Sequence, residues 1–167
     1  MEFIPVNEPI IGEKEKELVL NCLNTGWISS EGSFVKEFES KFSHKCKRHY
    51  GIAVSSGTAA LDIAIQALNI KKGDEIILPS FTIISCIHQI VRIGAIPILV
   101  DSDFKTWNMD ISKIEERITS KSKAILVPHI YGLSVDMTFI LALAKQYNLL
   151  VIEDAAEMIG QECRAKP

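Results

Sequence analysis

The spacing of hydrophobic residues changes at Tyr50, and this change constrains the fold of the 167-residue chain more than any other feature. From there to the C-terminus, short aliphatic or β-branched runs alternate with segments of helical apolar spacing, which is typical of βαβ units. Because the runs are continuously apolar, we expect a mostly parallel sheet covered by helices on both faces, a three-layer α/β fold. The runs predict strands near residues 51–54, 75–78, 96–100, 123–127 and 149–153.

Helical spacing predicts the remaining elements. Residues 13–23 are rich in helix formers and are followed by a stop at Thr25 and Gly26. Phe34, Phe38 and Phe42 recur at a spacing of four and form one apolar stripe on a second helix. Within the α/β part, the same reasoning predicts helices over 58–68, 82–93, 110–118 and 136–147.

Composition excludes several classes of partner. With 47% hydrophobic and 23% charged residues, the chain suits a soluble domain with a sizeable core. Its net charge of −3 is spread along the length, so we expect no nucleic-acid partner. No apolar stretch approaches the roughly 20 residues that a membrane span needs, and the N-terminus lacks the pattern of a secretory signal. We therefore expect a cytoplasmic protein without membrane contact, with reduced thiols at Cys22, Cys46, Cys86 and Cys163.

Ligands of a parallel α/β sheet bind beyond the carboxyl ends of the strands. The first such segment, 55–58 (Ser-Ser-Gly-Thr), leads directly into a predicted helix, where backbone N–H groups and hydroxyls could hold a phosphate. An ordinary Ser/Thr helix cap followed by glycine is equally compatible with this tetrapeptide. Because neither GxGxxG nor GxxxxGK[ST] occurs, the phosphate would belong to something smaller than a dinucleotide. The other segments are 79–82, 128–132 and 154–157.

Asp154 follows the apolar run 149–153, so we expect a carboxylate at the carboxyl end of a central, buried strand. Burying a carboxylate is costly unless it meets a cation. One interpretation is a cap for the next helical segment. The other is a partner for a protonated ring nitrogen, as the pyridinium of pyridoxal phosphate (PLP) requires if it is to act as an electron sink.

Histidines leave two further interpretations open. His129 lies between two candidate segments and could either bind ligand or simply hydrogen-bond to loop backbone. His44, Cys46 and His49 superficially resemble metal ligands, but they lie on or after a charged helix without a second ligand pair. We therefore expect no metal.

Five ordered segments together resemble one known family. They are residues 25–32, 55–61, 73–79, 129–132 and 153–157. Over essentially its whole length, the chain resembles the N-terminal part of the PLP-dependent sugar aminotransferases of the DegT/DnrJ/StrS family, most of all their perosamine-synthase branch. The resemblance implies a large domain of the fold-type I PLP-dependent transferases, with PLP as cofactor.

The resemblance also implies roles for individual residues. Gly57 and Thr58, with the preceding Ser56, match the turn that anchors the cofactor phosphate. Asp154 matches the carboxylate paired with the pyridine nitrogen, and Glu157 matches a position beside the cofactor ring that is often Gln. Substrate binding is expected from Trp27, Ser29 and His129, although an ordinary surface turn remains an alternative for the first two.

Two departures from the family pattern stand out. Ile83 occupies the position where the family usually stacks an aromatic ring on the cofactor, and Phe81 is a possible substitute. The lysine that carries PLP in the family lies beyond Pro167, so we expect no catalytic lysine in this sequence and no activity from it alone; Lys166 is a poor surrogate. The expected domains are a helical segment with an active-site loop, 1–48, and an incomplete PLP-binding domain, 49–167, without the small C-terminal domain.

In complete relatives the implied activity is amination of a GDP- or dTDP-linked 4-keto-6-deoxy sugar by an amino donor such as glutamate. The expected setting is a homodimer that serves the synthesis of a surface polysaccharide such as O-antigen, or of an antibiotic sugar. Two other functions stay open: a PLP-dependent sugar dehydratase of the same family, and a non-catalytic α/β assembly module.

Overall fold

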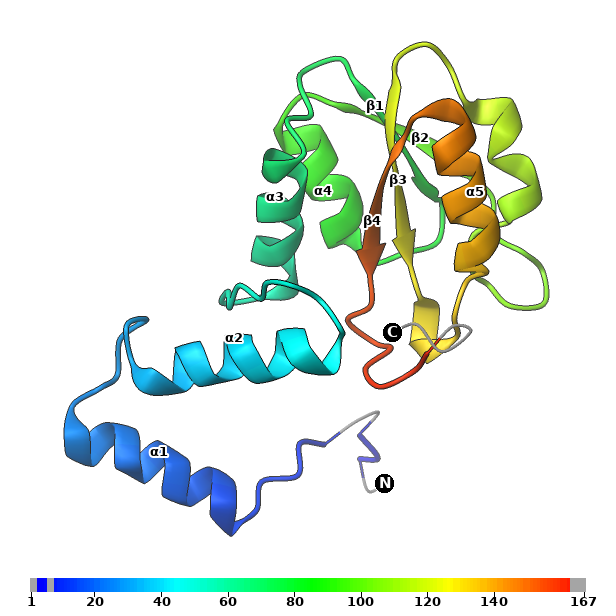
Figure 1. The fold of residues 1–167 in the computed structure, drawn as a ribbon. Helices are drawn as coiled ribbons and strands as arrows, with labels where there is room; N and C mark the ends of the chain where they lie inside the picture. The colour runs from blue at the N-terminus through cyan, green and yellow to red at the C-terminus, as the bar shows by residue number, and fades with distance from the viewer. Residues whose placement is uncertain (1–2, 6–7, 163–167) are drawn as a thin grey trace. The chain divides into compact units, whose positions relative to one another are not determined.

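The structure, a computed structural model, describes residues 3–5 and 8–162; Cys163 and Lys166, which the sequence analysis singled out, lie outside this part. The chain divides into two compact units, Met1–Ala53 and Val54–Pro167, which we describe separately (Figure 1). The sequence analysis expected a boundary after residue 48, a few residues earlier. No helix in the described part is long and apolar enough to cross a membrane.

The first unit holds two helices, α1 (Glu13–Thr25) and α2 (Ser33–Lys45), which confirms both predictions for this region. At the start of α1, the Glu15 carboxylate accepts the Gly12 N–H at 2.8 Å, and the helix ends at Gly26, whose φ of +75° is favourable for glycine. On α2, the rings of Phe38 and Phe42 stack with their centroids 5.4 Å apart. The helix thus carries the expected aromatic stripe.

The second unit is built on a four-stranded sheet with the order β2-β1-β3-β4, in which all three strand pairs are parallel. The strands are β1 (Glu75–Pro79), β2 (Ile96–Val100), β3 (Ser122–Pro128) and β4 (Leu150–Asp154). These strands confirm the α/β fold and four of the predicted strands. The order is typical of βαβ units, because β1 lies beside β2 and β3 lies beside β4, and the strands of each pair are joined by a crossover connection.

Two expectations about the sheet were wrong. Residues 51–54 form no strand, and Ile52 is 70% exposed. A strand needs a neighbour to pair its backbone groups, and no strand of the described chain lies against this segment. β4, expected to be central, is an edge of the described sheet and is only partly buried. An apolar run reveals burial, but it does not reveal a strand's position in the sheet.

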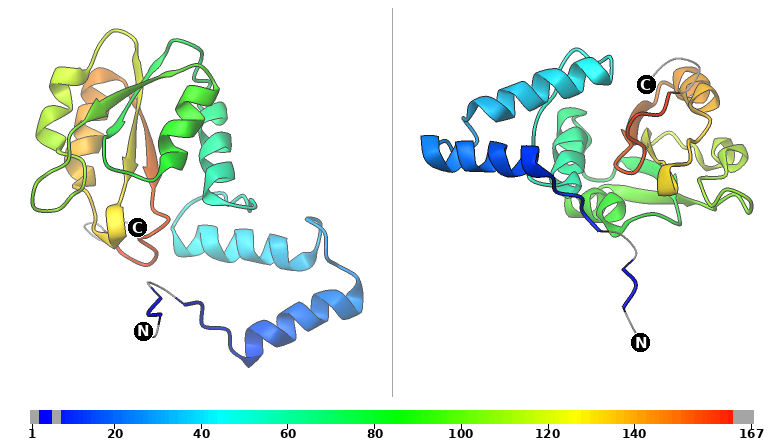
Figure 2. Two further views of the ribbon diagram at one scale, coloured as in Figure 1. Left: turned by 180° about the vertical axis from the view of Figure 1, so that it is seen from behind. Right: turned by 90° about the horizontal axis from the view of Figure 1, so that it is seen from below.

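Helices cover both faces of the sheet (Figures 1 and 2). α3 (Gly57–Ala67) and α4 (Ile84–Arg92) pack together on one face, and α5 (Met137–Tyr147) covers the other. Alternate strand residues point to opposite faces, so Ile76, Leu78, Ala124, Leu126 and Ile152 join the core under α3 and α4. Ile77, Ile125 and Val127 join the core under α5. The predicted three-layer arrangement is confirmed.

The predicted helix over 110–118 is instead two short 3₁₀ turns, η1 (Ile111–Lys113) and η2 (Glu115–Arg117). Asp110 begins η1 by accepting the Ser112 N–H at 3.1 Å. Ile114, fully buried, packs into the core that α5 covers. The spacing of three between Ile111 and Ile114 suits a 3₁₀ turn as well as an α-helix, so the apolar pattern could not distinguish the two.

After β3 the chain makes a tight 3₁₀ turn, η3 (Ile130–Gly132), in which Gly132 has no room for a side chain. Its φ is +79°, and a Cβ atom there would lie 2.9 Å from the backbone oxygen of Glu157. The segment after β4 therefore packs directly against this turn.

We predict that Gly132→Ala destabilises the fold by about 2 kcal/mol or more, because it combines an unfavourable φ with a clash against backbone. Gly73→Ala is the matched control: φ is +88°, but a Cβ there has nothing within 4 Å. This control should cost only about 1 kcal/mol. Urea unfolding of both variants measures the difference, and equal losses would show that the contact with Glu157 is unimportant.

Candidate functional site

The carboxyl ends of the four parallel strands meet at one edge of the sheet, and α3 begins at that same edge (Figure 1). A short connection leads from the end of α3 at Ala67 to the start of β1 at Glu75, so the helix runs antiparallel to β1. Its N-terminus therefore lies where the strands end. This is the edge at which α/β sheets bind their ligands.

The N-terminus of α3 leaves two backbone donors unused. The Ser56 side chain accepts the Ala59 N–H at 3.2 Å, and its carbonyl accepts the Ala60 N–H at 3.0 Å. Among the described residues, none accepts the N–H of Gly57 or Thr58. Both residues are exposed, and a Cβ atom on Gly57 would meet nothing within 4 Å. The tetrapeptide thus caps the helix, and the N–H groups of Gly57 and Thr58 are exposed; phosphate binding there remains a prediction.

Asp154, the last residue of β4, lies on the same face of the sheet as α3. Ile152, two residues earlier, belongs to the core under α3 and α4, and strand alternation places Asp154 on that side as well. The side chain confirms this, because the Cys86 thiol of α4 donates to Asp154 Oδ2 at 3.5 Å. The Ala156 N–H donates to Oδ1 at 3.2 Å. Among the described residues, each oxygen of the carboxylate thus has one donor, and further lone pairs have no donor there.

These groups fit the two ends of PLP. The free N–H groups at α3 suit a phosphate, and the open side of Gly57 lets a ligand approach the backbone closely. A carboxylate with spare lone pairs suits a protonated ring nitrogen. Both features lie on one face and at one edge of the same unit, as binding of one small molecule by both would require.

Glu157 lies just after β4 and is tied to the turn that follows β3. Its Oε2 accepts the Tyr131 N–H at 2.6 Å. Buried Asn108 fixes the same turn, because its Oδ1 accepts the Ile130 N–H at 2.9 Å and its Nδ2 donates to the Leu133 carbonyl at 2.8 Å. One carboxylate oxygen of Glu157 is thus held by backbone, and the expected place of this residue beside a cofactor ring remains a prediction.

The His129 side chain is buried and is not exposed to a ligand at the sheet edge. It is only 2% exposed, and the Val135 N–H donates to its Nδ1 at 3.1 Å. The ring hydrogen therefore lies on Nε2, which donates to Glu153 Oε1 at 2.9 Å. Since both ring nitrogens are used within the protein, this geometry favours the interpretation of a loop histidine that fixes the ends of β3 and β4.

The segment after β1 carries the residues expected to cover the cofactor ring. Ile83 precedes the first turn of α4 and is 63% exposed, so its aliphatic side chain is available to a ligand. Phe81 packs edge to face against Trp107, with 5.6 Å between ring centroids. This contact holds Phe81 against the loop that follows β2.

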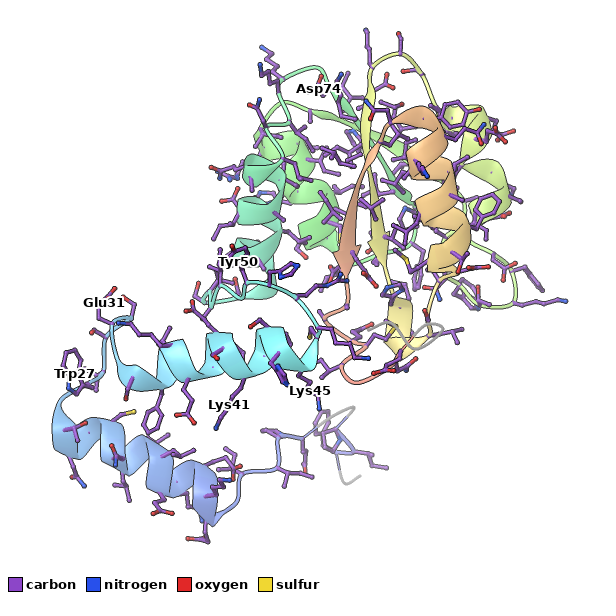
Figure 3. The ribbon with its side chains drawn as sticks, viewed as in Figure 1. Trp27, Glu31, Lys41, Lys45, Tyr50 and Asp74 are labelled. Atoms are coloured by element: carbon purple, nitrogen blue, oxygen red, sulfur yellow. The ribbon has the colours of Figure 1, made fainter. Side chains whose placement is uncertain are left out.

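Trp27 and Ser29 lie in the first unit, on the connection between α1 and α2. Figure 3 labels Trp27 on this connection. Trp27 and Ser29 line a cavity of about 360 Å³ together with Cys22 and Phe34. Their expected role in substrate binding remains a prediction.

The second unit is therefore an α/β unit in which a helix N-terminus and a carboxylate lie at the carboxyl edge of a parallel sheet. The family model of the DegT/DnrJ/EryC1/StrS aminotransferases matches residues 9–167. The chain belongs to this family, which confirms the resemblance inferred from the sequence.

Individual relatives agree with this assignment. The chain is 48% identical over 166 residues to a GDP-perosamine synthase of Escherichia coli O157:H7, covering 99% of this chain and 46% of that protein. Among solved structures, a sugar aminotransferase from Streptococcus pneumoniae in its PLP form superposes with a TM-score of 0.90 at 28% identity, covering 98% of this chain and 45% of that one. The chain thus spans about half the length of the relatives it matches.

A third relative has a different activity. A GDP-4-keto-6-deoxymannose-3-dehydratase, solved with PLP and glutamate trapped together, superposes with a TM-score of 0.91 at 27% identity, covering 98% of this chain and 44% of that one. The solved neighbours with PLP agree with the cofactor expected from the sequence, and they support the fold-type I assignment.

Sequence reasoning missed one contact of the site. Cys86 was interpreted only as a reduced thiol, yet it is fully buried and contacts both Asp154 and Thr82, whose hydroxyl donates to its sulfur at 3.4 Å. Burial raises the pKa of the Cys86 thiol to about 11, and the Asp154 carboxylate adds to the increase. Cys86 and Asp154 are 68 residues apart, and no local pattern could have paired them.

Proposed function

We propose that this chain is the cofactor-binding part of a PLP-dependent aminotransferase that acts on a nucleotide-linked 4-keto-6-deoxy sugar. The observation that carries the proposal is the meeting of the α3 N-terminus and the Asp154 carboxylate on one face and at one edge of the sheet. The family match supports the same cofactor.

In this proposal five residues hold the cofactor, two of them at the N-terminus of α3. The N–H groups of Gly57 and Thr58 bind the cofactor phosphate at the positive end of α3. Asp154 accepts the N–H of the protonated pyridine ring and keeps that nitrogen charged. Ile83 covers one face of the ring and excludes water, and Glu157 lies at the ring's edge. When bound, PLP supplies the electron sink that lets an amino group pass from a donor to a sugar ketone.

The proposed substrate is a GDP-linked 4-keto-6-deoxyhexose, with glutamate as the amino donor. The 48% identity to a GDP-perosamine synthase supports this choice. The reaction replaces the C4 ketone oxygen with an amino group and converts glutamate into 2-oxoglutarate. We propose that this reaction takes place in the cytoplasm and that its product is used to make surface polysaccharide. We also propose that Trp27 and Ser29 contribute to substrate binding.

A dehydratase is the second candidate, because a GDP-4-keto-6-deoxymannose-3-dehydratase superposes with a TM-score of 0.91. Its identity to this chain is 27%, far below that of the perosamine synthase, which favours amination. A non-catalytic assembly module, the third function considered, would bind no cofactor.

We further propose that the protein forms homodimers. α1 has no buried residue in this chain and exposes Val19, Leu20 and Leu23, each more than half accessible. Exposed apolar stripes of this kind mark surfaces that bind other proteins. Sedimentation equilibrium should show dimers that dissociate when Leu20 and Leu23 are both changed to Glu, whereas a wild-type monomer at high concentration contradicts the proposal.

For the cofactor site, we predict that the chain binds pyridoxamine phosphate and that Asp154→Asn weakens this binding by about ten- to a hundredfold, because a charge-assisted hydrogen bond to the ring nitrogen is lost. This ligand carries the same phosphate and pyridine as PLP but no aldehyde, so it cannot react with surface lysines. Isothermal titration calorimetry at neutral pH measures the dissociation constants.

Asp101→Asn is the matched control, since Asp101 is an exposed carboxylate just beyond β2. It should leave the affinity unchanged, and pyridoxamine without phosphate should bind far more weakly than the phosphorylated form. The proposal fails if the wild-type chain shows no saturable binding, or if both Asn variants behave alike.

For the reaction, we predict that the natural polypeptide carrying this sequence converts GDP-4-keto-6-deoxymannose and glutamate into a GDP-linked amino sugar and 2-oxoglutarate in equal amounts. Mass spectrometry of the nucleotide sugar separates the candidates, because a dehydratase would yield a sugar that lacks one hydroxyl and carries no amino group. The dTDP-linked substrate tests the choice of nucleotide, and comparable turnover of both would contradict the preference for GDP.

A further inference from the structure

A chain of hydrogen bonds leads from α4 to the carboxylate at the end of β4. The Thr82 hydroxyl donates to the Cys86 sulfur at 3.4 Å, and the Cys86 thiol donates to Asp154 Oδ2 at 3.5 Å. Thr82 precedes α4 and Cys86 lies in its first turns, one helical turn further along. The sulfur is fully buried, whereas Asp154 is half-buried at the sheet edge.

This geometry fixes the carboxylate from two sides. The Ala156 N–H donates to Oδ1 at 3.2 Å, so without Cys86 the group would be held by one oxygen only and could turn about its Cβ–Cγ bond. The Thr82 hydroxyl occupies the sulfur's acceptor side, which leaves the thiol hydrogen for Asp154. Thr82 thus orients the Cys86 thiol, and the thiol orients the Asp154 carboxylate.

We propose that Cys86 is a positioning residue that holds the Asp154 carboxylate in the orientation in which it receives the cofactor's ring nitrogen, and that Thr82 orients the thiol for this task. The inference rests on the proposed function, because it assigns a neighbour to the carboxylate of that same site. Cys86 itself touches no ligand.

A thiol suits this task for two reasons. It is a weak donor, so it orients the carboxylate while taking little of the negative charge that the ring nitrogen needs. The sulfur also fills apolar space, since Cys86 belongs to the core that contains Ile90, Leu61 and Ile152. The core under α3 and α4 therefore extends without a gap to the carboxylate.

The ligand-free protein provides the first test. With ¹³Cβ-labelled cysteine, NMR follows the ionisation of Cys86 against pH in the full chain. Asp154→Asn should lower the pKa of the thiol, because the neighbouring negative charge disappears and the new amide group can donate to the thiolate, and Thr82→Val should raise it, because a donor to the thiolate is lost. An unchanged pKa in Asp154→Asn overturns the contact on which the inference depends.

The second test uses pyridoxamine phosphate. Cys86→Ala should weaken binding about fivefold, the equivalent of one ordinary hydrogen bond, and Cys86→Ser, which keeps a donor, should recover most of the affinity. Cys46→Ala is the matched control, since Cys46 lies in the first unit at the end of α2. If packing alone mattered, Ser and Ala at position 86 would reduce the affinity equally, and that result overturns the positioning role.

The two tests separate this inference from the proposed function. Absence of binding by the wild-type chain overturns the proposed function. Wild-type binding that Asp154→Asn weakens and Cys86→Ala leaves intact overturns the positioning role alone. Should Cys86→Ala fail to fold, Thr82→Val against Thr82→Ser provides the same comparison one step further from the carboxylate, with a loss of affinity expected only for Val.

Discussion

The parallel pairing of β3 with β4 is the constraint on which the site depends. It places Pro128 opposite Asp154, and the His129 N–H then donates to the Asp154 carbonyl at 3.1 Å. Because neighbouring strand residues point to opposite faces, Glu153 meets the buried His129 while Asp154 turns toward α4. A register shift of one residue would turn Asp154 away from α4 and place the longer side chain of Glu153 on that face instead.

The packing of the sheet then determines how firmly that acid is held. Ile76, Leu78 and Leu126 are fully buried beneath α3 and α4, so both helices are fixed on the face that carries Asp154. Proteins pack their interiors densely, and a shift of α4 would be felt throughout this core. The position of Cys86, which donates to Asp154, is thus set by the apolar contacts of this core.

The sequence predicted the parts of this structure that local pattern encodes. The strand β1 follows from an apolar run, the capped N-terminus of α3 follows from Ser56 before Gly57 and Thr58, and Asp154 was expected at the end of a strand because it follows an apolar run. Residues 51–54 were wrongly predicted as a strand, since a strand depends on a neighbour that its own residues do not specify. The contact between Cys86 and Asp154 was missed for a related reason: it exists only after two distant segments pack together.

The charges at the site restrict the class of ligand more than the shape of the site does. At one place the unpaired N–H groups of α3 attract negative charge, and at another a carboxylate with spare lone pairs attracts positive charge. A simple anion would gain from the first feature and be repelled by the second, and a simple cation would meet the reverse. A molecule that carries a phosphate at one end and a protonated ring nitrogen at the other gains from both features. The pairing of these two features therefore favours a pyridoxal-type cofactor over a free phosphate or a nucleotide bound by its phosphates alone.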